Sequence, residues 1–88
     1  MKKLTTGEVN LMKKFGIENV EAEVTCTRTN PMSGESAALN PAAAKMYDLI
    51  QMMYQSYNNG GPFKVQDFDR LRMLFLKFWR DSYNTLLD

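Results

Sequence analysis

Arg72 is the residue with the clearest potential for recognition chemistry, because a helix through it places its charge on an apolar side. Four large apolar side chains flank it there, those of Phe68, Phe75, Leu76 and Trp79. A buried guanidinium is costly unless it meets a carboxylate, carbonyl groups or an aromatic face, or reaches the edge of the core. We expect a partner within this chain, namely Glu21, Glu23 or a tyrosine. The alternative is an anion or a carboxylate from a binding partner.

Three other cations, Arg70, Lys77 and Arg80, lie within about 80° of one another on the polar side of the same predicted helix. Such a group can meet the phosphates of a nucleotide or a nucleic acid. Asp81 and Asp88 share this face, and the formal charge of the whole chain is only +1. A solvated surface is therefore the favoured interpretation, and phosphate or nucleic-acid binding is the alternative function.

Residue types that commonly perform catalysis or bind metals are scarce. The chain has no histidine, which removes the commonest general base and metal ligand. Cys26 is the only cysteine, so it cannot build a thiolate zinc site and fits a buried structural thiol. Asp67 and Asp69 suit the positive end of a helix better than an acid–base pair. We therefore predict a protein that is not an enzyme and that has no cofactor and no metal.

Residues 29–34, Thr-Asn-Pro-Met-Ser-Gly, have the composition of a turn. They include one glycine, which does not match the spacing of a phosphate-binding loop. Asn-Pro and Ser-Gly are turn dipeptides, so the simplest interpretation is the turn of a β-hairpin. Asn30 and Met32 are nevertheless candidate partner contacts, because loops on a rigid scaffold often bind.

Local signals in the first half define two of the elements that must position these residues. Thr5 and Glu8 have the spacing of a capping box, and Gly16 stands where a helix often ends, which predicts a short helix over 6–15. Apolar and polar residues alternate over 20–28, which predicts a half-buried strand. With residues 35–39 as its return strand, a β-hairpin is expected over 20–39.

Two longer helices are predicted in the second half. Asn40 is a good helix cap and Pro41 a good first helical residue, so a helix is expected over 41–57. A second is expected over 66–87, and the short loop between them makes the two antiparallel neighbours. The predicted fold is therefore a single α+β domain, 1–88, mostly helical: a short N-terminal helix, a β-hairpin, and a long antiparallel helix pair.

The predicted last helix carries more apolar surface than one packed side requires. Its apolar residues cover an arc of about 220°, whereas a helix packed on one side needs roughly 100°. Met52, Met73 and Leu76 lie at or beyond the edges of their apolar stripes, and methionine is enriched at protein interfaces. The predicted function is a non-enzymatic protein-interaction module that binds another protein or a second copy of itself.

Composition indicates a cytoplasmic protein. The lysines near the start are not followed by the apolar core of a signal peptide, and no segment approaches the length of a membrane span. We expect no membrane partner.

Three segments resemble small proteins encoded by tailed bacteriophages that have no known activity. They are the turn Thr29–Gly34, the helical segment Ala44–Asp48, and the final Asp81–Asp88 with its Tyr83, Leu86 and Leu87. The resemblance implies a viral accessory protein in the bacterial host cytoplasm, or a minor virion component. It implies no functional residue.

Overall fold

The computed structural model describes residues 4–61 and 64–87, which form an α+β fold of mostly helical content. The elements, in chain order, are α1 (Thr6–Phe15), β1 (Cys26–Thr29), β2 (Ser36–Leu39), α2 (Pro41–Asn58), α3 (Val65–Phe78) and α4 (Arg80–Leu86). The predicted fold class is confirmed. None of the described helices is long and apolar enough to cross a bilayer.

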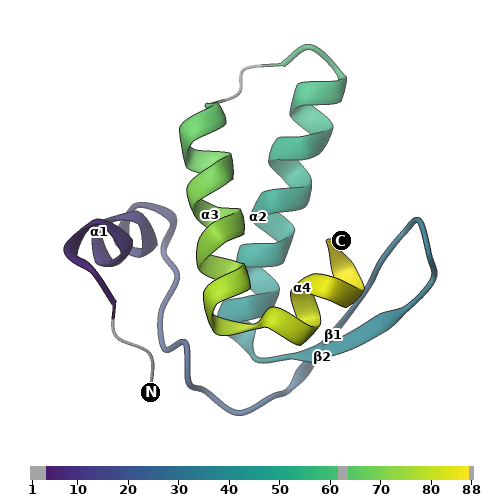
Figure 1. Cartoon of the computed structure of the whole chain (residues 1–88), viewed down its shortest axis with the longest axis horizontal. Coiled ribbons are helices and arrows are strands. Elements are labelled where there is room, and N and C mark those ends of the chain that lie inside the picture. Colours follow the sequence, from purple (N-terminus) through teal and green to yellow (C-terminus); the bar gives the residue numbers. More distant parts are fainter. Residues whose placement is uncertain (1–3, 62–63, 88) are drawn as a thin grey trace.

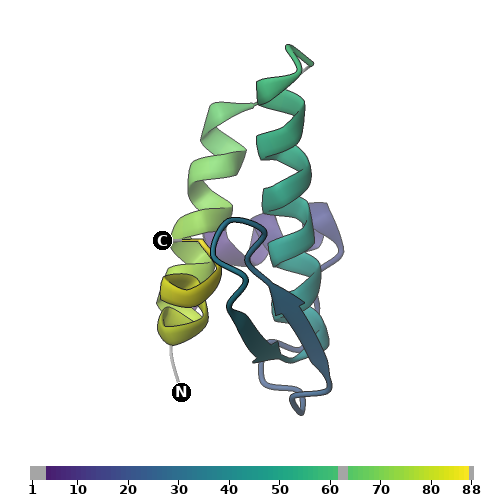
Figure 2. The same cartoon turned by 90° about the vertical axis from the view of Figure 1, so that its right-hand side faces the viewer.

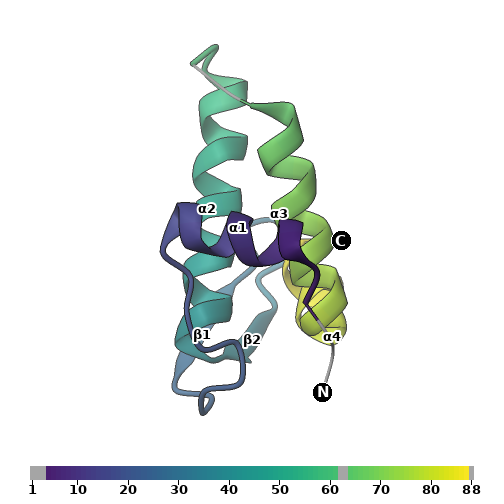
Figure 3. The same ribbon diagram turned by 90° about the vertical axis from the view of Figure 1, so that its left-hand side faces the viewer.

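The antiparallel pair α2–α3 forms the middle of the molecule. Helix α1 crosses one face of this pair, and the β-hairpin and α4 cover the other (Figures 1, 2 and 3). The ends of α2 and α3 at their connecting loop extend beyond these covering elements (Figure 1). The core lies at the covered end and has these buried hydrophobic residues: Leu11, Met12, Ile17, Leu39, Ala42, Ala43, Ala44, Met46, Tyr47, Ile50, Leu71, Leu74, Phe75 and Leu86.

Helix α1 has the predicted bounds and α2 begins as predicted and ends one residue later, because the signals at these helix ends are local. The hydroxyl of Thr5 accepts a hydrogen bond from the backbone N–H of Glu8, and the Glu8 carboxylate accepts one from the backbone N–H of Thr5. Gly16 ends α1 in the left-handed conformation, with φ 69°. The side chain of Asn40 caps α2 by accepting from the backbone N–H of Ala43 at 2.8 Å.

The β-hairpin is shorter than predicted, and residues 20–25 are not a strand. β1 and β2 pair antiparallel from Cys26 opposite Leu39 to Thr29 opposite Ser36. Further pairing would need residues after Leu39 as partners, but Asn40 already caps α2 there. The Asn40 amide instead donates to the backbone carbonyls of Val20 and Ala22 at 2.8 and 3.2 Å. The prediction of a strand from the alternating pattern is therefore wrong for residues 20–25.

The predicted single helix over 66–87 is wrong, because the chain breaks at Trp79 into α3 and α4. Trp79 has φ −134° and ψ 59°, yet its N–H still donates to the Phe75 carbonyl and its carbonyl accepts from Tyr83 N–H, both at 2.8 Å. The break directs α4 toward the β-hairpin, where Leu86 is buried (Figure 1). The apolar residues of the predicted helix cover a wide arc because they belong to two helices that pack in different directions.

Candidate functional site

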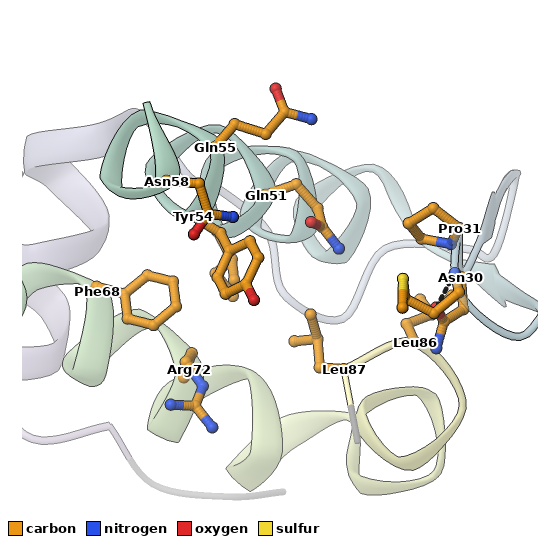
Figure 4. Close-up of a pocket in the computed structure, with 12 residues that line it drawn as sticks. Asn30, Pro31, Gln51, Tyr54, Gln55, Asn58, Phe68, Arg72, Leu86 and Leu87 are labelled. Atoms are coloured by element: carbon orange, nitrogen blue, oxygen red, sulfur yellow. Dashed lines mark hydrogen bonds between the residues drawn. The ribbon is translucent and has the colours of Figure 1, made fainter. Parts of the chain in front are cut away.

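An open groove of about 520 Å³ lies between α2, α3, the end of α4 and the hairpin turn (Figure 4). It is the candidate functional site, and we call it the groove throughout. Its lining residues are Asn30, Pro31, Met32, Ile50, Gln51, Tyr54, Gln55, Asn58, Phe68, Arg72, Leu86 and Leu87. Binding sites are typically lined by apolar and aromatic side chains together with a few polar groups, as this groove is.

The apolar part of the groove exists because the apolar stripe of α2 continues past the covered end of the helix pair. Ile50 is the last buried residue of α2, and one turn later Tyr54 is 53% exposed. Phe68 on α3 and Leu87 after α4 are half-buried. The side chains of Tyr54, Phe68 and Leu87 point into the same space from three segments (Figure 4). The groove therefore offers large apolar side chains that the chain itself covers only in part.

Arg72 lies on the α3 side of the groove and finds a tyrosine, one of its expected partners. Its Nη2 donates to the hydroxyl of Tyr83 at 2.8 Å, and its guanidinium carbon lies 5.4 Å from the ring centroid of Phe68. A guanidinium has several N–H donors, and within residues 4–61 and 64–87 this is its one hydrogen bond. No carboxylate of the described chain pairs with it. Among the described residues, its charge is therefore held in place without a neutralising carboxylate.

Asn30 lines the groove and is also held by hydrogen bonds within the turn, so its role as a partner contact stays a prediction. It is 7% exposed; its amide donates to the carbonyl of Thr85 at 3.0 Å, and its side-chain oxygen accepts from the backbone N–H of Met32 at 2.8 Å. These bonds fix the turn against α4 and so close one end of the groove. Met32, at the rim, is 93% exposed, as predicted for a residue available to a partner.

Amide side chains line the α2 side of the groove. Gln51, Gln55 and Asn58 follow one edge of this helix, at spacings of four and three residues. The Gln51 amide donates to the hydroxyl of Tyr47 at 2.8 Å. The side chains of Gln55 and Asn58 are exposed and make no hydrogen bond to another residue in the described ranges. Amides that both donate and accept suit a peptide backbone.

Three residues predicted to bind a partner do not line the groove. Met52 and Met73 are exposed, and Leu76 is half-buried on α3. Met73 lines a second, shallower hollow between α1 and α3, with Arg70 and Asp69. The predicted partner-binding set is thus divided: Arg72, Met32 and Asn30 line the groove, and Met52, Met73 and Leu76 lie elsewhere.

The three cations of the phosphate-binding alternative are also separated. Arg70 lies at the second hollow, and exposed Arg80 belongs to α4 beyond the break. Lys77 pairs with the Glu8 carboxylate at 2.9 Å and joins α3 to α1. Each cation therefore has a different setting, whereas the prediction placed all three on one helical face.

This ion pair gives a prediction for the dependence of stability on pH. The backbone N–H of Thr5, and secondly Lys77, hold the pKa of Glu8 below its ordinary value of 4.5. A lowered folded-state pKa adds stability above the unfolded-state pKa, and this stability is lost as the pH falls through the folded-state pKa. Glu8→Gln keeps an acceptor for Thr5 but removes the charge. Between about pH 6 and pH 3 the variant should lose less stability than the wild type, by up to about 1 kcal/mol.

Urea unfolding at the two pH values measures this difference. Asp67 is present in both proteins, and the hydrogen bond from Lys14 also lowers its pKa. Both proteins should therefore lose the stability that Asp67 contributes as the pH falls. An equal loss of stability in the two proteins would contradict the role assigned to Glu8.

Asp67 and Asp69 do not act as a pair. Asp67 is buried in the first turn of α3 and accepts from Lys14 of α1 at 2.8 Å, whereas Asp69 is exposed. Helix α3 begins after Lys64 without a side-chain cap, and Asp67 lies in its first turn, near the positive helix end. Among the described residues, no group of three His, Cys, Asp or Glu is placed to hold a metal ion.

No family model, curated protein or solved structure matches this chain. The groove must therefore be interpreted from its own geometry.

Proposed function

We propose that this protein is a non-enzymatic interaction module that binds a segment of another protein in the groove. The observation that carries this proposal is the groove itself, an open hollow of about 520 Å³ where Tyr54, Phe68 and Leu87 converge beside Arg72. Tyrosine and arginine are enriched among the residues that dominate binding energy at protein interfaces. An open groove with amide side chains along one wall suits a peptide segment better than an enclosed small molecule.

A foreign partner is favoured over a second copy of this chain by the charge in the groove. Arg72 is the one charged side chain among the described residues that line it. A two-fold dimer joins the same surface on both copies, so it would bring two guanidinium groups together with no carboxylate among the described lining residues to separate them. The phage resemblance suggests a setting, which we propose as a viral accessory or minor structural protein in the host cytoplasm or the virion.

Phosphate or nucleic-acid binding is less well supported. Neutralising several phosphates needs clustered cations, and Arg70, Lys77 and Arg80 lie in three settings. The formal charge of +1 adds no long-range attraction.

The proposed function can be tested without knowledge of the natural partner. Peptides are selected from a random display library on the wild-type protein, and one is titrated into isotope-labelled protein while the backbone amide shifts are followed. We expect the largest shifts around Tyr54, Phe68 and Leu87, and small shifts in α1. Failure to select any peptide, or shifts centred on α1, would contradict the proposal. A mass that rises with concentration in light scattering would favour self-association instead.

A further inference from the structure

We infer that the groove selects an acidic segment, in which a carboxylate of the partner protein binds the Arg72 guanidinium and a neighbouring large apolar side chain packs against Phe68 and Leu87. This inference rests on the proposed function, since it names the chemistry of the partner at the same groove. It is carried by three features of the described residues: Arg72 has no carboxylate partner among them, its guanidinium is held by two contacts, and no acidic side chain is among those that line the groove.

The charge of Arg72 differs from those of three basic residues that form ion pairs between segments of this fold. Lys14, Arg28 and Lys77 each meet a carboxylate, of Asp67, Asp48 and Glu8 respectively, at 2.8–2.9 Å. Within residues 4–61 and 64–87, Arg72 meets only a neutral hydroxyl and an aromatic face. Its side chain is half-buried, where an incoming carboxylate would interact more strongly than at a fully exposed site. A carboxylate of the binding partner would neutralise Arg72, as carboxylates of this chain neutralise those three basic side chains.

The two contacts of Arg72 also hold it ready for a ligand. Tyr83, on α4, accepts from one terminal nitrogen, and the Phe68 ring lies one helical turn before Arg72 on α3. The guanidinium is thus positioned from two sides, while its remaining donors have no partner among the described residues. A planar guanidinium can bind a carboxylate through two parallel hydrogen bonds, which makes it more selective than a lysine. Tyr83 is a positioning residue in this arrangement.

The remainder of the groove defines what must adjoin the carboxylate. Phe68 lies on one side of Arg72, and the side chain of Leu87 projects into the space between Arg72 and α2 (Figure 4). A large aliphatic or aromatic side chain next to the acidic residue would fill this space and bury apolar surface. The exposed amides of Gln55 and Asn58 lie along the α2 edge, where the backbone of an extended segment would pass.

Selection from a random-peptide display library tests the inference directly. Peptides retained by the wild-type protein should be enriched in Asp or Glu beside a large apolar residue. The same library is selected on Arg72→Gln, which keeps polar contacts but removes the charge, and there the acidic enrichment should be lost. Arg72→Lys, which keeps the charge but not the planar fork, should retain a weaker acidic preference.

A second arm alters the peptide, so that it does not depend on the folding of a variant. The carboxylate of one selected peptide is replaced by the corresponding amide, and affinity is measured by fluorescence anisotropy. The change should weaken binding to the wild type about tenfold or more, and binding to Arg72→Gln by less than about twofold. If Arg72→Gln does not fold, as judged by circular dichroism, the wild-type measurement alone decides.

The outcomes separate this inference from the proposed function. Retained peptides without acidic enrichment, or an amide change with little effect on wild-type binding, would overturn the inference and leave the interaction module standing. An equal loss in wild type and Arg72→Gln would also overturn it, because the carboxylate would then bind elsewhere. If no peptide is retained, the proposed function fails and the inference fails with it.

Discussion

Phe75→Ala should lower the free energy of unfolding by about 3–5 kcal/mol, the largest effect we expect of any single truncation in this chain. Phe75 is fully buried, and its ring centroid lies 6.5 Å from that of Tyr47, 5.4 Å from that of Trp79 and 6.4 Å from that of Tyr83. It therefore joins α2, the helix break and α4. Since small domains have only about 5–15 kcal/mol of stability, the variant should be close to unfolding.

Thermal unfolding followed by far-ultraviolet circular dichroism measures this loss, and Phe68→Ala is a matched control. Phe68 is on the same helix but only half-buried at the groove, so its truncation should cost clearly less stability. It should weaken peptide binding instead. If the two variants are equally stable, the assignment of Phe75 to the core and of Phe68 to the groove is wrong.

Leu86→Ala should cost about 2–5 kcal/mol, because it removes the buried side chain that fixes α4. Leu86 is 2% exposed, and the neighbouring carbonyl of Thr85 accepts from Asn30 in the turn. Loss of this anchor should loosen α4, the turn and the end of the groove together. Hydrogen exchange should show faster exchange in residues 80–87 and 30–34 than in α2.

Leu87→Ala is the matched control for Leu86→Ala. Leu87 is only half-buried and points into the groove, so we expect a smaller loss of stability and a larger loss of peptide affinity (Figure 4). A Leu86→Ala variant with wild-type stability would contradict the packing of α4 after the break at Trp79.

The elements that sequence reasoning predicted well are those with their signals close to their ends. Thr5 with Glu8, Gly16, and Asn40 with Pro41 fixed the bounds of α1 and the start of α2, because a cap acts within one turn of its helix. The antiparallel helix pair followed from a short loop. These predictions did not depend on contacts between distant residues.

The two errors of fold arise from contacts between distant residues. Residues 20–25 alternate like a strand, but Leu39 is followed by the cap and start of α2, so the described part of the chain has no partner strand for them. Trp79 is preceded and followed by residues compatible with a helix, and no proline or glycine marks the break. Contacts that α4 makes with distant residues favour two helices there, namely the burial of Leu86, the Asn30–Thr85 bond and the Arg72–Tyr83 bond.

The candidate site was predicted only in part. Arg72 was identified because a charge among apolar residues is visible in the sequence, and a tyrosine was among its expected partners. Tyr54, Phe68 and Leu87 were missed as site residues, since their positions on apolar stripes predict burial. What leaves them partly uncovered is the reach of α2 and α3 beyond the elements packed on them, which the sequence pattern does not reveal (Figure 1).

The most direct test of the interaction groove compares Tyr54→Ala with Met73→Ala. Both residues are exposed on long helices, at 53% and 63%, so neither truncation should disrupt folding, but only Tyr54 lines the groove. The affinity of a selected peptide should fall about tenfold or more for Tyr54→Ala and by less than about twofold for Met73→Ala. An unchanged affinity for Tyr54→Ala, or a greater loss for Met73→Ala, would contradict binding at the groove.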